Sequence, residues 1–142
     1  MLIRRVTMDD LDSIINIDTE ISGTGKPDYW RDIISSYTGN REKHFFLVAV
    51  RDGQIIGFVI GEIRAWEFGS APCGWVFTIG VKPDNRLGRV GSELLDELCN
   101  LFHQAGMTKV RTMTSRQDYD VMSFFRSQGM MSGPYQQLEK EL

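Results

Sequence analysis

The stretch IGVKPDNRLGRVGSELL, at Ile79–Leu95, carries more structural information than any other part of the chain. It begins at the end of an apolar run, turns at Pro83 and enters a pattern of apolar residues at helical spacing. The first turn of such a helix offers unpaired backbone N–H groups and the positive end of the helix dipole, which together attract anions. Gly88 and Gly91 let a ligand approach the backbone closely, and Arg86 and Arg89 add positive charge. The stretch therefore predicts a pyrophosphate site.

A second interpretation of the same residues is an exposed turn whose arginines are simply solvated. The two common nucleotide motifs do not decide between these interpretations. No G-x-G-x-x-G opens this helix, and no G-x-x-x-x-G-K-[ST] occurs in the chain. Dinucleotide enzymes and P-loop proteins are therefore disfavoured.

Outward from this stretch, apolar periodicity and turn residues divide the chain into alternating strands and helices. Thr7 and Asp10 resemble a capping box, and Asp52-Gly53 is a strong hairpin signal. The predicted strands are 2–6, 45–51, 54–64, 75–81, 109–114 and 135–142; the predicted helices run from 7 to about 19, from 27 to about 37, from 88 to 105 and from 119 to 128.

The predicted order is β-α-α-β-β-β-α-β-α-β. Antiparallel hairpins come first and a strand-helix-strand crossover follows, which predicts an α/β (α+β) fold with one mixed sheet and helices on both faces. We found no internal repeat and no linker, so residues 1–142 are expected to form a single domain.

The central stretch resembles the coenzyme A motif of the GNAT (GCN5-related N-acetyltransferase) superfamily. In that motif a strand ending in Val-x-Pro is followed by Arg/Gln-x-x-Gly-x-Gly/Ala. The predicted order of elements also resembles that fold over essentially the whole chain. The positions that fall in register are Val81, Pro83, Arg86, Val90, Gly91, Ser92, Leu94 and Leu95.

Two positions depart from the family pattern. Arg89 stands where the family has its central glycine, and Gly88 precedes it. Arg89 can donate its N–H and pair with a phosphate, or it can narrow the loop and weaken binding. A later segment, Asp118–Met130, keeps the apolar pair and the glycine of a second family motif. However, Phe125 replaces the tyrosine that often protonates the leaving thiolate.

The resemblance implies acetyl-coenzyme A as the cosubstrate and a primary amine as the acceptor. It also implies that acetyl-coenzyme A lies between two splayed strands, with the Ile79 N–H polarising the thioester carbonyl. The implied coenzyme A-binding residues are Ile79, Gly80, Val81, Arg86, Leu87, Gly88, Arg89, Val90, Gly91, Ser92, Asp118 and Phe125.

An attacking amine must lose a proton, so we looked for a general base and a general acid. Glu62, late in the second hairpin strand, is the first candidate base, and Glu20, at the end of the first helix, is the second. Tyr119 is the candidate acid. Each of the three can equally be an ordinary surface or packed side chain. His44 and His103 have no partner at the spacing of a metal site or catalytic triad.

Composition narrows the remaining possibilities. The net charge is −3, which disfavours general nucleic-acid binding, and two cysteines do not form a disulfide framework. We expect no metal site, no membrane segment and a cytoplasmic location. Homodimers are common in the family, and no interface feature in the sequence decides the matter.

Three functions agree with these residues. The first is N-acetyl transfer to a small molecule or a protein. The second is a module of the same fold that binds acyl-coenzyme A without turnover. The third is a transferase with a different acyl donor or acceptor.

Overall fold

The computed structural model describes the backbone of residues 1–142 and every side chain except that of Leu87. The strands are β1 (Leu2–Arg5), β2 (His44–Arg51), β3 (Gln54–Arg64), β4 (Cys73–Val81) and β5 (Val110–Thr112). The α-helices are α1 (Leu11–Ser22), α2 (Pro27–Gly39), α3 (Val90–Gln104) and α4 (Tyr119–Ser127). Short 3-10 helices are η1 (Met8–Asp10), η2 (Glu67–Gly69) and η3 (Pro83–Gly88).

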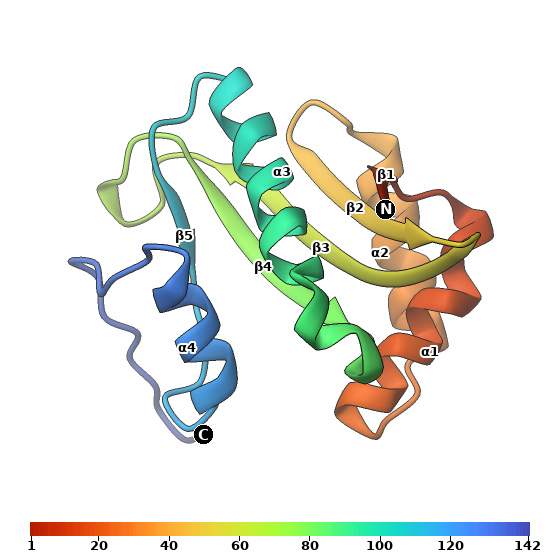
Figure 1. Ribbon diagram of the computed structural model, residues 1–142. Helices are drawn as coiled ribbons and strands as arrows, with labels where there is room; N and C mark the ends of the chain where they lie inside the picture. The colour runs from red at the N-terminus through yellow and green to blue at the C-terminus, as the bar shows by residue number, and fades with distance from the viewer.

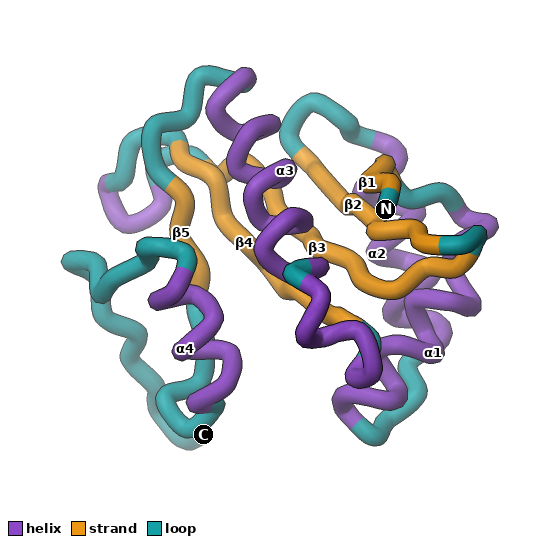
Figure 2. Tube along the Cα trace, viewed as in Figure 1, coloured by secondary structure: helices purple, strands orange, loops and turns teal.

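The strands form one five-stranded sheet in the order β1-β2-β3-β4-β5. The first four strands are antiparallel, and β5 joins β4 in parallel after the crossover through α3. Figure 1 shows α3 in front of the sheet with α4 beside it, and α1 and α2 behind. The same layers are seen in the tube coloured by secondary structure (Figure 2). The predicted mixed sheet with helices on both faces is confirmed.

Each face of the sheet has its own apolar core. Leu94, Leu98 and Phe102 of α3 lie on the front face, where Gly61 leaves no space for a side chain: a Cβ there would lie 2.9 Å from Leu98 Cδ2. On the back face, Ile14 of α1 and Trp30 of α2 pack with apolar residues of β2 and β3. Successive side chains of β3 point to opposite faces and pack in both cores, so the strand is buried on both sides.

Two local signals in the sequence have the predicted structure. Asp52 and Gly53 have φ angles of 53° and 73°, as a tight hairpin turn between two strands requires. Thr7 and Asp10 form the capping box, in which the Thr7 N–H donates to the Asp10 carboxylate at 2.8 Å. This box starts η1 and α1, which together run three residues beyond the predicted end at Thr19.

Other boundaries differ from the prediction. The predicted helix over 88–105 is α3, which begins at Val90 rather than at residue 88, because Gly88 ends η3 and Arg89 is left-handed. The predicted strand over 109–114 pairs only at Val110–Thr112. The predicted last strand, 135–142, is wrong, since these residues have no regular structure and are exposed. Their apolar positions, Tyr135, Leu138 and Leu142, are spaced by three and four residues and so give a strand no apolar face.

None of the helices that the structure describes is both long and apolar enough to cross a lipid bilayer.

Candidate active site

The centre of the site is the fork between β4 and β5. The two strands pair from Gly74–Val76 to Val110–Thr112, and beyond this point no described residue of β5 pairs with β4. The Thr112 hydroxyl donates to the Val76 carbonyl at 3.0 Å, which satisfies an acceptor where the pairing stops. Below this point the strands diverge, with α3 and α4 on either side of the opening (Figure 1).

A β-bulge lies at the mouth of the fork. Ile60 pairs with Thr78 whereas Gly61 pairs with Val76, so Phe77 is an extra residue on β4. A bulge bends its strand and increases the local twist, which is the change needed to separate β4 from β5. The Phe77 side chain is 48% exposed, consistent with its position outside the regular pleat.

The backbone of β4 offers hydrogen-bond donors to the fork. The Lys82 N–H donates to the Ile56 carbonyl of β3 at 2.8 Å, so it points away from β5. Because N–H groups alternate between the two edges of a strand, those of Val81 and Ile79 point toward β5 and the opening. The predicted polarising donor, the Ile79 N–H, therefore faces the fork.

The predicted pyrophosphate site lies where β4 leads through η3 into α3. The first hydrogen bond of the helix joins the Glu93 N–H to the Arg89 carbonyl at 3.0 Å. No described side chain caps the N–H groups of Val90, Gly91 and Ser92, which precede it. These donors, which no described side chain caps, and the helix dipole make the start of α3 suitable for an anion.

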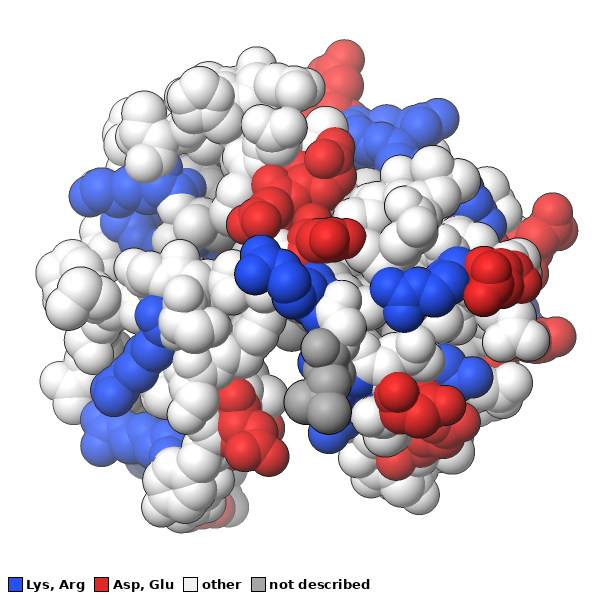
Figure 3. All heavy atoms as spheres, viewed as in Figure 1, with Lys and Arg blue, Asp and Glu red and all other residues white. Residues whose placement is uncertain are grey.

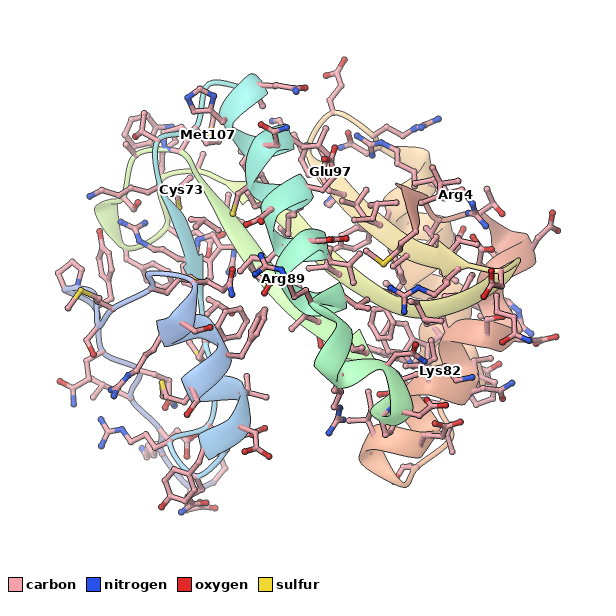
Figure 4. The ribbon with its side chains drawn as sticks, in the orientation of Figure 1. Arg4, Cys73, Lys82, Arg89, Glu97 and Met107 are labelled. Atoms are coloured by element: carbon pink, nitrogen blue, oxygen red, sulfur yellow. The ribbon has the colours of Figure 1, made fainter. Side chains whose placement is uncertain are left out.

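Arginines stand beside these donors. Arg86 and Arg89 are both exposed, and among the described side chains no carboxylate lies within salt-bridge distance of either. Figure 4 places Arg89 at the start of α3, on the side that faces α4. In Figure 3, Lys and Arg side chains lie at the head of a hollow between the α4 lobe and the rest of this face. Leu87, another predicted coenzyme A contact, lies outside the described side chains.

Helix α4 closes against the start of α3. A Cβ at Gly91 would lie 3.2 Å from Phe124 Cε1, so only glycine leaves the ring its present position. The Gln128 amide donates to the Ser92 hydroxyl at 3.0 Å. The two helices therefore meet at the residues that the family motif assigns to the cofactor.

Two other predicted coenzyme A contacts have structural roles within the chain. Asp118 caps α4, accepting a hydrogen bond from the Val121 N–H at 3.2 Å. Phe125 is buried in the front core, with its ring 5.3 Å from that of Phe124. Contact between either residue and coenzyme A stays a prediction.

Glu62, the first candidate base, lies in a polar cluster on the α2 side of the sheet. His44 is its cross-strand partner, with Nε2 3.3 Å from a Glu62 carboxylate oxygen, and Arg64 Nε is 3.9 Å from the other oxygen. The ring of Tyr37 lies 4.7 Å from that of His44. Burial, and then the charge of Glu62, raise the pKa of the Tyr37 hydroxyl to about 12.

The two ring nitrogens of His44 have different surroundings. The Nδ1 atom is buried, with no hydrogen-bond partner among the described residues, whereas the Nε2 atom faces the Glu62 carboxylate at 3.3 Å. His44 was expected to have no partner, because the shifted register that places it opposite Glu62 has no local signal in the sequence.

The structure does not bring the three predicted catalytic residues together. Glu20 is exposed and lines a cavity of about 740 Å³ between α1 and the β2–β3 hairpin, together with Gln54 and Lys82. Tyr119 is 76% exposed at the start of α4. A second cavity, of about 510 Å³, lies at the β1–α2 edge and is lined by Arg5 and Arg41. None of the fork residues lines either cavity.

In the described part of the chain, no group of three His, Cys, Asp or Glu side chains is placed to hold a metal ion. The candidate site combines strand-edge amides, an uncapped helix N-terminus, two exposed arginines and the Glu62 carboxylate, which faces His44.

The profile of the acetyltransferase (GNAT) family matches residues 11–130, which include the whole fork and both flanking helices. The chain belongs to the GNAT family. The resemblance deduced from the motif around Arg86 and Gly91 is confirmed.

Solved structures share the fold of this GNAT chain. The aminoglycoside 6'-N-acetyltransferase AAC(6')-Ig from Acinetobacter haemolyticus is 17% identical, with a TM-score of 0.85 over 100% of this chain and 99% of its own. The aminoglycoside N-acetyltransferase AAC(6')-Iy, solved with coenzyme A, is 17% identical, with a TM-score of 0.86 over 99% and 93%. A ribosomal-protein-alanine N-acetyltransferase from Brucella melitensis biovar Abortus 2308 is 17% identical, with a TM-score of 0.80 over 100% of both chains.

At these identities the likeness establishes the fold alone. The neighbours act on different acceptors, antibiotics in two cases and a protein in the third, so they do not select one for this GNAT chain. No curated protein sequence matches the chain at a significant level.

Proposed function

We propose that this protein transfers the acetyl group of acetyl-coenzyme A to a primary amine, by direct attack of the amine in a ternary complex. The observation that carries the proposal is the free edge of β4 leading directly to the uncapped start of α3. Family membership supports the reaction class.

The pyrophosphate fits the start of α3. The N–H groups of Val90, Gly91 and Ser92 would donate to its oxygens, and Arg86 and Arg89 would balance its charge. The pantetheine arm would then follow β4 into the fork, where backbone groups of Val81 and Ile79 would hydrogen-bond with its amides. AAC(6')-Iy, which has this fold, was solved with coenzyme A.

The Ile79 N–H would stabilise the negative charge that develops on the thioester oxygen. A donor fixed in this way commonly contributes about 10²–10³ in rate. The amine nitrogen forms a bond to the carbonyl carbon, the carbon–sulfur bond breaks, and coenzyme A leaves as a thiolate. A thiol has a pKa of roughly 8.5, so the thiolate departs without a strong acid. This matters because Phe125 carries no proton to donate, and Tyr119 is the remaining candidate acid.

Glu62 would receive the proton that the amine loses. It lies opposite Trp75 on β4, and Ile79 is four residues further along that strand. That separation is about 13 Å at 3.3 Å per residue, so the proton would travel through water. Holding both reactants in the fork supplies much of the remaining acceleration.

A module that binds coenzyme A without turnover is the second candidate. Phe125 at the position of the family's tyrosine and Arg89 at that of its glycine favour it. A transferase with a different acyl group or acceptor is the third. An aminoglycoside acceptor, as in AAC(6')-Ig, would need free carboxylates for its several ammonium groups, but Glu62 and Glu67 both lie within 4.0 Å of Arg64.

The test is calorimetric titration of the protein with acetyl-coenzyme A. We expect a dissociation constant on the order of micromolar. Arg86→Ala and Gly91→Glu should weaken binding, because one removes a phosphate partner and the other places a carboxylate and a side chain in the first turn of α3. Arg31→Ala on α2, where Arg31 pairs with Asp28, is the matched control. No binding by the unmodified protein would refute the proposal. Release of thiol with added amines then separates turnover from simple binding.

A further inference from the structure

The cavity of about 510 Å³ lies at the β1 edge of the sheet, where β1 and η1 face the end of α2. β1 and β5 are the outer strands of the sheet, so this edge is the one opposite the fork (Figure 1). The volume of the cavity falls in the range of about 300–1,000 Å³ that is typical of small-molecule pockets. A ligand in this cavity would therefore bind apart from acetyl-coenzyme A.

Two arginines line the cavity, and its described lining residues include no Asp or Glu. Neither the Arg5 nor the Arg41 guanidinium has a carboxylate within salt-bridge distance among the described side chains. Burial, and then the charge of Arg41, lower the pKa of Arg5 below its ordinary value. A cleft lined by charges of one sign concentrates ions of the opposite sign. The cavity therefore attracts an anion.

Arg5 is fixed at the wall of the cavity by three contacts. One terminal nitrogen donates to the His44 carbonyl at 3.0 Å, and the other donates to the Arg41 carbonyl at 3.1 Å. The guanidinium also lies 4.9 Å from the centre of the Phe45 ring. A guanidinium has more N–H groups than these two bonds use, so donors remain for a ligand. Because the group is already held in place, little side-chain freedom is lost when it binds an oxyanion.

The neighbouring charges set the charge of the ligand. Helix α2 ends at Gly39 beside the cavity, and the negative end of its dipole offsets only about half a charge. The Asp10 carboxylate lies 3.5 Å from the Thr7 hydroxyl at the rim, but two hydrogen bonds pair it with Arg4. The charges of the two guanidinium groups are therefore the larger ones, and together they fit a phosphate dianion better than a single carboxylate.

The remaining wall of the cavity is largely apolar. Val6, Tyr37 and Phe46 are buried and line it, and Met8 lies at its rim with 44% of its surface exposed. Covering such a wall removes apolar surface from water, which favours binding by about 25 cal/mol per Å². The wall therefore favours an organic anion over an inorganic one.

We propose that this cavity is a further ligand site, and that it binds a small phosphate monoester with an apolar body. The phosphate would lie between the Arg5 and Arg41 guanidinium groups, and the apolar body would cover Val6 and Phe46. The inference goes beyond acetyl transfer and does not rest on it, because no residue of the fork lines the cavity. Binding at this site makes and breaks no covalent bond.

The experiment follows the backbone amide NMR signals of the isotope-labelled protein during titration with phenyl phosphate, inorganic phosphate, benzoate and benzylamine. Phenyl phosphate should bind with a Kd of about 1 mM or below. Inorganic phosphate lacks the apolar body and benzoate lacks the second charge, so both should bind about tenfold more weakly or worse. Benzylamine, a cation, should not bind. The amides that shift should be those of Thr7, Thr38 and Arg41, not those of Val90–Ser92 at the start of α3.

Variants assign the binding to residues. Arg41→Gln should weaken phenyl phosphate binding by about tenfold, because one charge-assisted pair is lost. Arg41 is exposed, so this variant should keep the fold. Met8→Glu should abolish binding by placing a carboxylate at the rim, whereas Met8→Gln, which has the same shape without the charge, should not. Arg86→Ala at the start of α3 should leave the affinity measured at the Thr7 and Arg41 amides unchanged.

Shifts confined to the start of α3, or binding of none of the probes, would overturn the inference. So would equal affinity for inorganic phosphate and phenyl phosphate, or unchanged affinity in both Arg41→Gln and Met8→Glu. None of these results bears on acetyl transfer, which the titration with acetyl-coenzyme A tests separately. Conversely, a protein that fails to bind acetyl-coenzyme A but binds phenyl phosphate in this cavity would lose the proposed function and keep this site.

Discussion

Arg89 is the residue at which the sequence and the backbone disagree most. Its φ of 60° and ψ of 18° are left-handed, and it stands at the junction of η3 and α3. Gly88, one place earlier, is not among the positive-φ residues. The junction therefore requires glycine-like freedom at residue 89, whereas the chain supplies its glycine at residue 88. A binding role of the guanidinium would explain an arginine here better than packing does, because the side chain is exposed.

Arg89→Gly should therefore stabilise the fold by about 1 kcal/mol. Removing the strain of the left-handed backbone raises the free energy of unfolding by about 1–2 kcal/mol. The greater conformational freedom of glycine in the unfolded chain offsets part of this gain. Urea unfolding measures the change. Arg86→Gly is the matched control, since Arg86 has no positive φ and should lose stability instead. If Arg89 also pairs with a phosphate, Arg89→Gly will bind acetyl-coenzyme A more weakly than the unmodified protein. Equal free energies of unfolding for the two proteins would show that the backbone at Arg89 is not strained.

Glu62 is the second residue whose surroundings define a role. Its carboxylate faces His44 on one side and Arg64 on the other. These two neighbours fix the position of the carboxylate, and a general base must be positioned.

Glu62→Gln should lower kcat by about 10²-fold or more while leaving the dissociation constant of acetyl-coenzyme A unchanged. His44→Ala should lower kcat less, because it removes only the group that orients Glu62. Steady-state kinetics beside calorimetry gives both values. Glu67→Gln is the control, as it removes a neighbouring carboxylate that pairs with Arg64 without facing His44. Unchanged turnover in Glu62→Gln would exclude this residue as the base and leave the family assignment intact.

At the scale of elements, local sequence signals predicted the structure correctly wherever interactions between near neighbours in the chain determine it. The capping box at Thr7 and the Asp-Gly turn were predictable because each depends on neighbours within a few residues. The fork was predictable only through the family, since it depends on a bulge that no local pattern marks. Phe77 lies within an ordinary apolar run, and its extra place in β4 follows from packing across the sheet.

The pairing of His44 with Glu62 was missed for a similar reason. A regular hairpin built outward from the Arg51–Gln54 pair would place residue 43 opposite Glu62. The register shifts by one between Ala49 and Val50, and this brings His44 opposite Glu62 instead. A one-residue shift moves every side chain to the other face, so a site that spans two strands cannot be assigned from turn position alone.

The start of α1 is the element whose stability is tied most directly to one charged pair. Arg4 forms two hydrogen bonds with the Asp10 carboxylate, at 2.8 and 2.9 Å, and the Thr7 N–H forms a third. The Arg4 hydrogen bonds lower the pKa of Asp10 below its ordinary value, and the Thr7 N–H adds to the effect. A depressed pKa contributes stability that is complete above the unfolded value, about 3.9, and is lost as the pH falls through the lower folded value.

Asp10→Asn should therefore cost about 1–2 kcal/mol at pH 7, and the cost should shrink as the pH falls from about 4 toward 2. Denaturant unfolding at a series of pH values measures it. Asp12→Asn is the control, because Asp12 is exposed and forms no ion pair or side-chain hydrogen bond with the described residues. A cost that stays constant down to pH 2 would show that the carboxylate charge is not what stabilises the helix start.

In the whole molecule, the regularly paired strands and the proposed binding edge lie in different parts of the sheet. β2 and β3 are buried on both faces and pair along their length, whereas β5 pairs at three positions and then leaves β4. The regular pairing is concentrated in β1–β4, and the proposed binding edge lies where β5 leaves β4. Helix α4 joins the front core through Phe125 and meets the start of α3 through Phe124 on Gly91 and Gln128 on Ser92, so a ligand at that start would also contact the α3–α4 junction.

Because acetyl-coenzyme A would bridge the start of α3 and the β4 edge, its binding should stabilise the folded state. At 100 times the dissociation constant the gain is about 2.7 kcal/mol, which for a chain of this size raises Tm by roughly 8 °C. Pantetheine lacks the pyrophosphate and should give a much smaller shift at the same concentration. Added salt should reduce the shift for the unmodified protein, since the phosphate contacts are exposed. Gly91→Glu should lose most of it, because its carboxylate meets the phosphates and its side chain meets Phe124. Equal shifts for acetyl-coenzyme A and pantetheine would place the binding energy in the fork alone and exclude the helix start as the anion site.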